Sequence, residues 1–132
     1  MLRTVLRLDK DFFMKNLFFV LFLYSTFFYA QKKDYKFLST DQHNTKWYYS
    51  FDKKTLDGFY SWLKVEETLQ TNPSAKSTEY LIEFKCTNKT MSDEIVIINW
   101  RERKPEIYRK KYPFTPIPKK HIGNSLIEKY CD

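Results

Sequence analysis

The chain has 132 residues, a net charge of +7, 30% charged residues and 42% hydrophobic residues. This length allows one folded domain, and this composition excludes both a disordered chain and a polytopic membrane protein. With two Gly, two His and two Cys in total, the sequence has no glycine-rich phosphate-binding loop and little material for a metal site.

The first thirty residues predict an export signal. Residues 17–30 carry no charge, Lys15 precedes them, and a charged segment follows at 32–34. About 20 apolar residues are needed to cross a bilayer, whereas a basic start, a short apolar run and a small residue at the cut are typical of a secretory signal. We therefore assign 14–30 as a signal peptide cleaved after Ala30, which leaves a mature chain that does not span the membrane. The alternative is an uncleaved anchor or a buried core helix.

Residues 1–13 are either an upstream extension or a long basic start of the signal, because Met14 begins a well-formed signal by itself. No cysteine lies near the cut, so we expect no lipid anchor. Removal of 1–30 takes away four basic and two acidic residues and leaves a net charge of +5. We predict a periplasmic or extracellular protein with a polar lead-in at 31–45 and a folded domain at 46–132.

Cys86 and Cys131 predict one disulfide bond. An even pair of cysteines in an exported chain favours a bridge, because the compartment is oxidising. The chain-entropy model gives a bond over this separation about 4 kcal/mol of stabilisation. The alternative is a reactive thiol, which would need a C-x-x-C spacing or a cationic setting. Cys86 instead lies in a strand pattern, and Cys131 is the penultimate residue.

Apolar residues that alternate with polar ones predict an antiparallel sheet. A first strand at 46–52 is followed by a reversal at 55–58, where Asp-Gly favours a turn. In the second strand, 59–68, the two faces separate into Tyr60 and Trp62 on one side and Phe59, Leu63 and Val65 on the other.

The later strands follow the same pattern. Residues 70–78 contain Asn, Pro and Ser and predict a loop. Residues 80–86 alternate, and 94–100 are β-branched and apolar enough for a central strand. A shorter strand is expected at 107–108. The inward residues of 80–86 are Tyr80, Ile82, Phe84 and Cys86.

The C-terminal segment predicts a short helix. Pro113, Pro116 and Pro118 interrupt any strand ladder, because proline has no N–H to donate. Residues 126–131 then fit a helix, with Asn124 or Ser125 as its N-cap. A bond from Cys131 to Cys86 would hold this helix against the sheet. The predicted fold class is α+β, a single antiparallel β-sheet with a C-terminal helix tied to it by a disulfide.

The order of these motifs resembles the surface-adhesin protein E family of small exported bacterial proteins. The resemblance covers roughly residues 46–131 and rests on Trp47, a turn with Gly58, Trp62-Leu63-Lys64-Val65, Tyr80-Leu-Ile-Glu-Phe-Lys-Cys86, and Asn124-Ser125 before a helix ending in Tyr130-Cys131. It implies an antiparallel sheet with a disulfide-tied C-terminal helix, a tendency to dimerise, and binding of host matrix and serum proteins. Lys85 stands where the family often has Asp, and the family's lipid-attachment Cys is absent.

No group of residues in the sequence predicts catalysis. His43 and His121 lie in polar segments without a metal-ligand spacing. Carboxylates occur at Asp57, Glu66-Glu67 and Asp93-Glu94, but the sequence does not place any pair of them in one pocket. We therefore expect neither an enzyme nor a metal or other cofactor.

A basic segment at 101–120 is the most informative surface feature. It carries a net charge of +6, with Tyr108, Tyr112 and Phe114 interleaved. Such a segment favours docking of a polyanion, and export makes nucleic acid a weaker candidate than a protein, a glycan or a lipid phosphate. The alternative is a solvated sheet edge whose charges prevent association. The candidate ligand-binding residues are Arg101, Arg103, Lys104, Arg109, Lys110, Lys111, Lys119 and Lys120.

Four aromatic residues allow two predictions: they lie in the core, or they form an exposed patch on an uncovered sheet face. They are Trp47, Tyr49, Trp62 and Trp100. Together these features predict a secreted or periplasmic, non-catalytic binding module that recognises a protein or an acidic polymer through a basic and aromatic surface. The alternative is a structural cell-envelope protein that acts through homodimerisation.

Overall fold

A computed structural model of the chain describes residues 33–132. The upstream extension predicted at 1–13 and the signal peptide predicted at 14–30 lie outside these residues. Within 33–132, no helix is both long and apolar enough to span a membrane.

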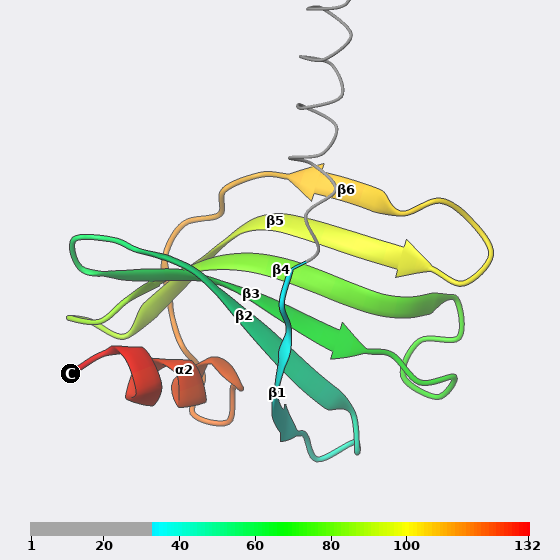
Figure 1. Cartoon of the computed structure of the whole chain (residues 1–132), viewed down its shortest axis with the longest axis horizontal. Coiled ribbons are helices and arrows are strands. Elements are labelled where there is room, and N and C mark those ends of the chain that lie inside the picture. Colours follow the sequence, from blue (N-terminus) through cyan, green and yellow to red (C-terminus); the bar gives the residue numbers. More distant parts are fainter. Residues whose placement is uncertain (1–32) are drawn as a thin grey trace, which may run out of the picture. The chain divides into compact units, whose positions relative to one another are not determined.

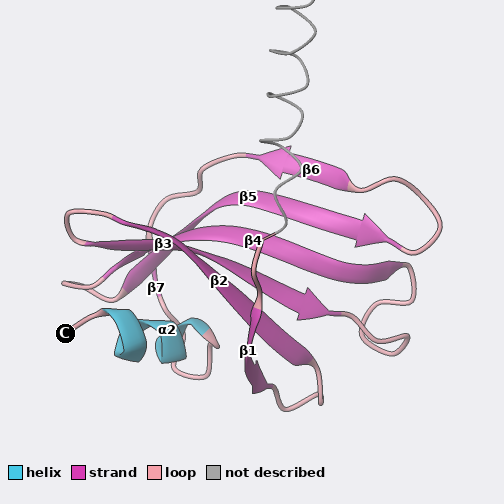
Figure 2. Cartoon of the chain, in the orientation of Figure 1, coloured by secondary structure: helices cyan, strands magenta, loops and turns pink. Residues whose placement is uncertain are grey.

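The described residues form one antiparallel sheet and one helix (Figure 1, Figure 2). The first six strands follow one another across the sheet in chain order. The seventh pairs with the first two residues of the fifth, Thr90 and Met91. The strands are β1 (Lys36–Thr40), β2 (Lys46–Lys54), β3 (Gly58–Glu66), β4 (Ala75–Lys85), β5 (Thr90–Trp100), β6 (Glu106–Arg109) and β7 (Thr115–Pro116), and the helix is α2 (Gly123–Tyr130). The predicted α+β fold is confirmed.

The hydrophobic core lies between α2 and one face of the sheet. Phe59 of β3 pairs with Phe84 of β4, and their rings stack with centroids 4.9 Å apart. Leu126 and Ile127 of α2 are buried against them. The remaining buried members of this cluster are Tyr49, Leu63 and Ile82. The alternation predicted for β3 is confirmed, because its second, fourth, sixth and eighth residues are buried.

We call the face that α2 covers the helix face and the opposite one the far face. On β3 the helix face carries Phe59, Leu63 and Val65, whereas Tyr60 and Trp62 lie on the far face. The antiparallel register carries this division to the neighbouring strands, because side chains of directly paired residues point to the same side.

The helix begins earlier than predicted and has a different cap. Ile122 occupies the N-cap position, and no side chain caps it, so the predicted caps Asn124 and Ser125 are wrong. The ring Nδ1 of His121 instead accepts a hydrogen bond from the Gly123 N–H at 2.9 Å. A Cβ atom at Gly123 would lie 2.8 Å from a Phe84 ring carbon, so glycine permits the close approach of the helix start to the core.

Three segments contain more strand than the sequence indicates. β1 lies within the lead-in at 31–45, where Lys36 pairs with Tyr49 of β2. β4 begins at Ala75, inside the segment 70–78 that was expected to be a loop. β7 forms within the proline-rich segment, because a two-residue edge strand tolerates a proline. These short pairings depend on a neighbouring strand rather than on a local pattern.

Candidate ligand-binding surface

A group of lysines and aromatic rings gathers on the far face, at the end of the sheet that holds the β2–β3 turn. Lys53 of β2 pairs with Tyr60 of β3, and Tyr60 pairs with Glu83 of β4. These three side chains therefore form one row across three strands. With the residues that contact them, they make up the basic–aromatic cluster: Lys53, Tyr60, Glu83, Lys85, Lys111 and Phe114.

The cluster has a single carboxylate at its centre. The Tyr60 hydroxyl donates to Glu83 Oε1 at 2.8 Å, and the Lys111 ammonium donates to the same oxygen and to the Tyr60 hydroxyl. Burial raises the pKa of Glu83, but the hydrogen bonds from Lys111 and Tyr60 outweigh it and hold the pKa below its ordinary value. The hydrogen bond to Glu83 raises the pKa of Lys111. Both groups are therefore charged at neutral pH.

The two rings hold the lysine ammonium groups in place. Lys85 Nζ lies 4.0 Å from the centroid of Phe114, and Lys111 Nζ lies 5.3 Å from the same centroid. Tyr60 has Lys53 Nζ at 5.0 Å and Lys111 Nζ at 5.4 Å. Contacts of this kind are attractive and restrict long side chains before any ligand arrives. Three ammonium groups thus surround the Glu83 carboxylate. Glu94 is near enough to help raise the pKa of Tyr60, and a net positive charge remains.

The segment after β6 is attached to β5, and this attachment positions Lys111 and Phe114. The Lys110 N–H donates to Glu94 O at 3.1 Å, and the Tyr112 N–H donates to Asp93 O at 2.9 Å. The hydroxyl of buried Ser92 also donates to the carbonyl of Tyr112. The chain on both sides of Lys111 is therefore fixed against the sheet.

The eight basic residues predicted as one strip do not form one surface. In Figure 1, the β5–β6 turn lies at one end of β6, and the chain leaves the other end of β6 before it turns toward α2. The hairpin therefore separates residues that are close in sequence. The strip divides into Arg101, Arg103 and Lys104 in the turn, Arg109, Lys110 and Lys111 at the end of β6, and Lys119 and Lys120 before α2.

Only Lys111 of the strip belongs to the basic–aromatic cluster. Arg101 donates from Nη2 to the carbonyl of Glu67 at 3.1 Å. Arg103 lies 3.9 Å from Glu106 and 4.2 Å from the centroid of Trp100. Both arginines thus have partners within the fold, and Glu106 offsets the charge of Arg103.

Of the four aromatic residues, Trp47 and Tyr49 share the helix face of β2, and the other two lie elsewhere. Tyr49 is buried in the core, and Trp47 stacks on Tyr80 with centroids 6.4 Å apart. Trp62 lies on the far face, since β3 alternates, and Trp100 ends β5, where its ring N–H donates to Glu106. The structure therefore does not combine the four into one patch.

Most of the basic–aromatic cluster is not evident from the sequence. Tyr60, Glu83 and Lys85 lie on the side that the alternation of their strands indicates. Lys53 does not, because a β-bulge between Phe51 and Lys53 moves it to the far face. What the pattern lacks is the register that aligns Lys53, Tyr60 and Glu83 in one row.

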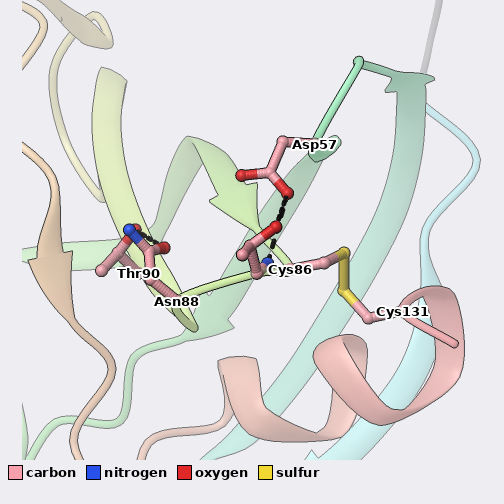
Figure 3. Close-up of a disulfide and its surroundings, with 6 residues drawn as sticks. Asp57, Cys86, Asn88, Thr90 and Cys131 are labelled. Atoms are coloured by element: carbon pink, nitrogen blue, oxygen red, sulfur yellow. Dashed lines mark hydrogen bonds between the residues drawn. A yellow bond between two sulfur atoms is a disulfide. The ribbon is translucent and has the colours of Figure 1, made fainter.

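The predicted disulfide between Cys86 and Cys131 is confirmed, with Cα atoms 5.6 Å apart and a sequence separation of 45. Figure 3 shows Cys131 reaching from the end of α2 to Cys86, with Asp57 nearby. The Cys86 N–H donates to the carbonyl of Asp57 at 2.7 Å. The β2–β3 turn therefore holds the disulfide-bonded residue that follows β4. An internal disulfide of this kind fits an oxidising compartment.

Among the described residues, no group of three or more His, Cys, Asp or Glu side chains is arranged to hold a metal ion. No family model matches the chain, and neither a curated protein nor a solved structure is significantly similar to it.

Proposed function

We propose that the protein is an exported, non-catalytic binding module that recognises an acidic polymer or an acidic protein surface through the basic–aromatic cluster. The observation that carries this proposal is the placement of Lys53, Lys85 and Lys111 around two rings, with the Glu83 carboxylate at the centre. The signal expected at 14–30 and the disulfide support the export part.

The cluster suits anions for two physical reasons. Its ammonium groups lie against aromatic rings or donate to Glu83, so the lysine side chains lose little conformational freedom when a ligand binds. Lys111 also retains 42% side-chain exposure beside its carboxylate partner, so a sulfate, carboxylate or phosphate group can reach it. Bonds from ammonium groups to such anions are charge-assisted.

The test is binding to immobilised heparin at low salt. A triple variant, Lys53→Gln, Lys85→Gln and Lys111→Gln, should bind about tenfold or more weakly, since each charged contact contributes about 1 kcal/mol or more. Binding should also weaken as salt rises. Thermal unfolding of each variant separates a folding defect from a binding defect.

The matched control removes the same charge elsewhere: Lys46→Gln, Lys76→Gln and Lys104→Gln, all at exposed positions. This control should bind nearly as the parent does. Equal losses in both triple variants would mean that net charge alone governs binding, and salt-independent binding would exclude the polyanion.

A second candidate is a structural envelope protein that acts as a homodimer, and the edge strand β6 favours it. The Lys110 N–H donates a hydrogen bond to the carbonyl of Glu94 in β5. In an antiparallel ladder every second residue directs its backbone N–H and C=O toward the neighbouring strand, so those of Tyr108 point toward β5 and those of Ile107 point away from it. Within the described residues β6 pairs only with β5, and Ile107 is 55% exposed. Sedimentation at high concentration should then show a dimer that Ile107→Lys dissociates, and a monomer would exclude this role.

A further inference from the structure

A cleft of about 410 Å³ lies between the β1–β2 turn and the turn that precedes α2. Both histidines described in the fold, His43 and His121, line it, although 78 positions separate them in sequence. Trp47 and Lys120 line it as well. We call it the two-histidine cleft, and it shares no residue with the basic–aromatic cluster.

The first wall of the cleft is a turn fixed by Asp41. One carboxylate oxygen, Oδ1, accepts the backbone N–H groups of His43 at 2.9 Å and Thr45 at 3.0 Å. The other, Oδ2, accepts the indole N–H of Trp47 at 3.0 Å. Both oxygens therefore already have donors within the fold, and the carboxylate fixes the backbone that carries His43 as well as the Trp47 ring.

The second wall is a turn fixed by Asn124. Its amide nitrogen donates to the carbonyls of Pro118 at 2.8 Å, Lys119 at 3.1 Å and His121 at 3.1 Å. The three bonds surround Lys120 and hold its backbone. Because both walls are ordered by internal hydrogen bonds, a ligand would meet a preformed site.

His121 presents a hydrogen-bond donor in its neutral form. Its Nδ1 accepts the Gly123 N–H at 2.9 Å, so the ring proton lies on Nε2. Together with the ammonium of Lys120 and the ring of His43, this gives the cleft hydrogen-bond donors. Both oxygens of its carboxylate, Asp41, already accept donors within the fold. The Trp47 ring, stacked on Tyr80, adds an apolar surface.

From this juxtaposition we infer that the two-histidine cleft binds a carboxylate carried on a ring. The carboxylate meets Lys120 and the histidine donors, and the ring packs against Trp47. Aromatic surfaces and a few placed polar groups are the usual composition of small-ligand sites. This site is separate from the proposed polyanion surface and goes beyond it.

The experiment is a ¹H–¹⁵N NMR titration of the purified protein with four probes: glucuronate, benzoate, glucose and acetate. The signals followed are the indole N–H of Trp47, assigned with Trp47→Phe, and the amide of Gly123. Saturable shifts with glucuronate or benzoate, but not with glucose or acetate, support the site, and the tighter of the two identifies a sugar or an aromatic ring. Absence of shifts with both ring carboxylates, or equal shifts with glucose or acetate, overturns it.

Variants locate the site. Lys120→Gln and His43→Gln should each weaken binding of the better probe about fivefold, the loss expected for one charge-assisted contact. Lys119→Gln, an exposed neighbour outside the cleft, should leave affinity within twofold. A loss as large in Lys119→Gln would overturn the assignment. The triple variant of the basic–aromatic cluster should bind the probe normally, so failure of one proposal is distinguishable from failure of the other.

Discussion

The helix face and the far face of the sheet are built from the same strands but are stabilised in different ways. On the helix face, Phe59, Phe84 and Leu126 have essentially no exposed surface and make no polar contact with one another. On the far face, Tyr60, Glu83 and Lys111 are joined by hydrogen bonds and remain partly exposed. Burial of apolar area dominates folding free energy, whereas exposed ion pairs contribute little. The stability of the fold should therefore reside on the helix face, which leaves the far face available for binding.

Truncation of the core is the strongest way to test this contrast. Phe84→Ala removes a fully buried ring that stacks on Phe59 and contacts the start of α2. We expect a loss of about 3–5 kcal/mol in the free energy of unfolding, measured by urea denaturation. Lys85 is the next residue of β4 and lies on the far face. Lys85→Ala should lower the free energy of unfolding by about 1 kcal/mol or less. Equal losses would contradict the assignment of stability to the helix face.

The disulfide should give the next largest effect, because it holds the end of α2 on the helix face. Replacing Cys86 and Cys131 together with Ser should lower the free energy of unfolding by about 2–4 kcal/mol. The oxidised parent should contain no titratable thiol. Two free thiols in the purified protein would refute the bond, and an unchanged unfolding curve for the double variant would show that packing alone holds the helix.

A smaller, pH-dependent effect is expected at the other end of α2. Burial lowers the pKa of His121, and Asp93 opposes this shift. The folded state therefore takes up the His121 proton at lower pH than the unfolded state, whose pKa is about 6.5. Stability from this group is complete above that value and declines as the pH falls below it, through the folded pKa. Protonation also removes the acceptor of the Gly123 N–H, a bond that contributes about 1 kcal/mol.

The measurement is urea denaturation between pH 7.5 and 5, compared with His121→Gln. The parent should lose stability as the pH falls through this range, and the variant should lose less. The other charged groups near His121 are Asp41, His43 and Lys120 of the cleft. Burial raises the pKa of Asp93, so its own contribution has the opposite sign and acts at lower pH, from its raised pKa downward. Parallel profiles for parent and variant would exclude His121 as the source.

The sequence was informative wherever a local pattern decides structure. The alternation in β2 to β4 predicted strands and faces, because side chains along a strand point to alternate sides. The β-branched, apolar run at 94–100 predicted β5. The disulfide followed from two cysteines and the export signal expected at 14–30. It was not informative where contacts depend on register or on the return of a hairpin. For this reason the sequence did not predict that the basic residues of 101–120 divide among three places, or that Lys53, Tyr60 and Glu83 form one row.

The helix cap illustrates the same limit on a smaller scale. Asn124 is a favoured capping residue by type, but its side chain turns back to three carbonyls of the preceding turn. His121, which is not a usual cap, accepts the Gly123 N–H instead. The position of the turn against the sheet decides between them, and no local pattern in the sequence reports that position.

The smallest expected effect lies on the far face and separates its stability from its binding. Tyr60→Phe keeps the ring that Lys53 and Lys111 approach but removes the hydroxyl that bonds Glu83 and Lys111. We expect a loss of about 0.5–1 kcal/mol in unfolding free energy, because each of these bonds is partly exposed. Tyr60→Ala removes the ring too and should weaken heparin binding further than Tyr60→Phe, compared at a temperature where thermal unfolding shows both variants to be folded. If both variants bind alike, the ring does not position the lysines, and the cluster acts by charge alone.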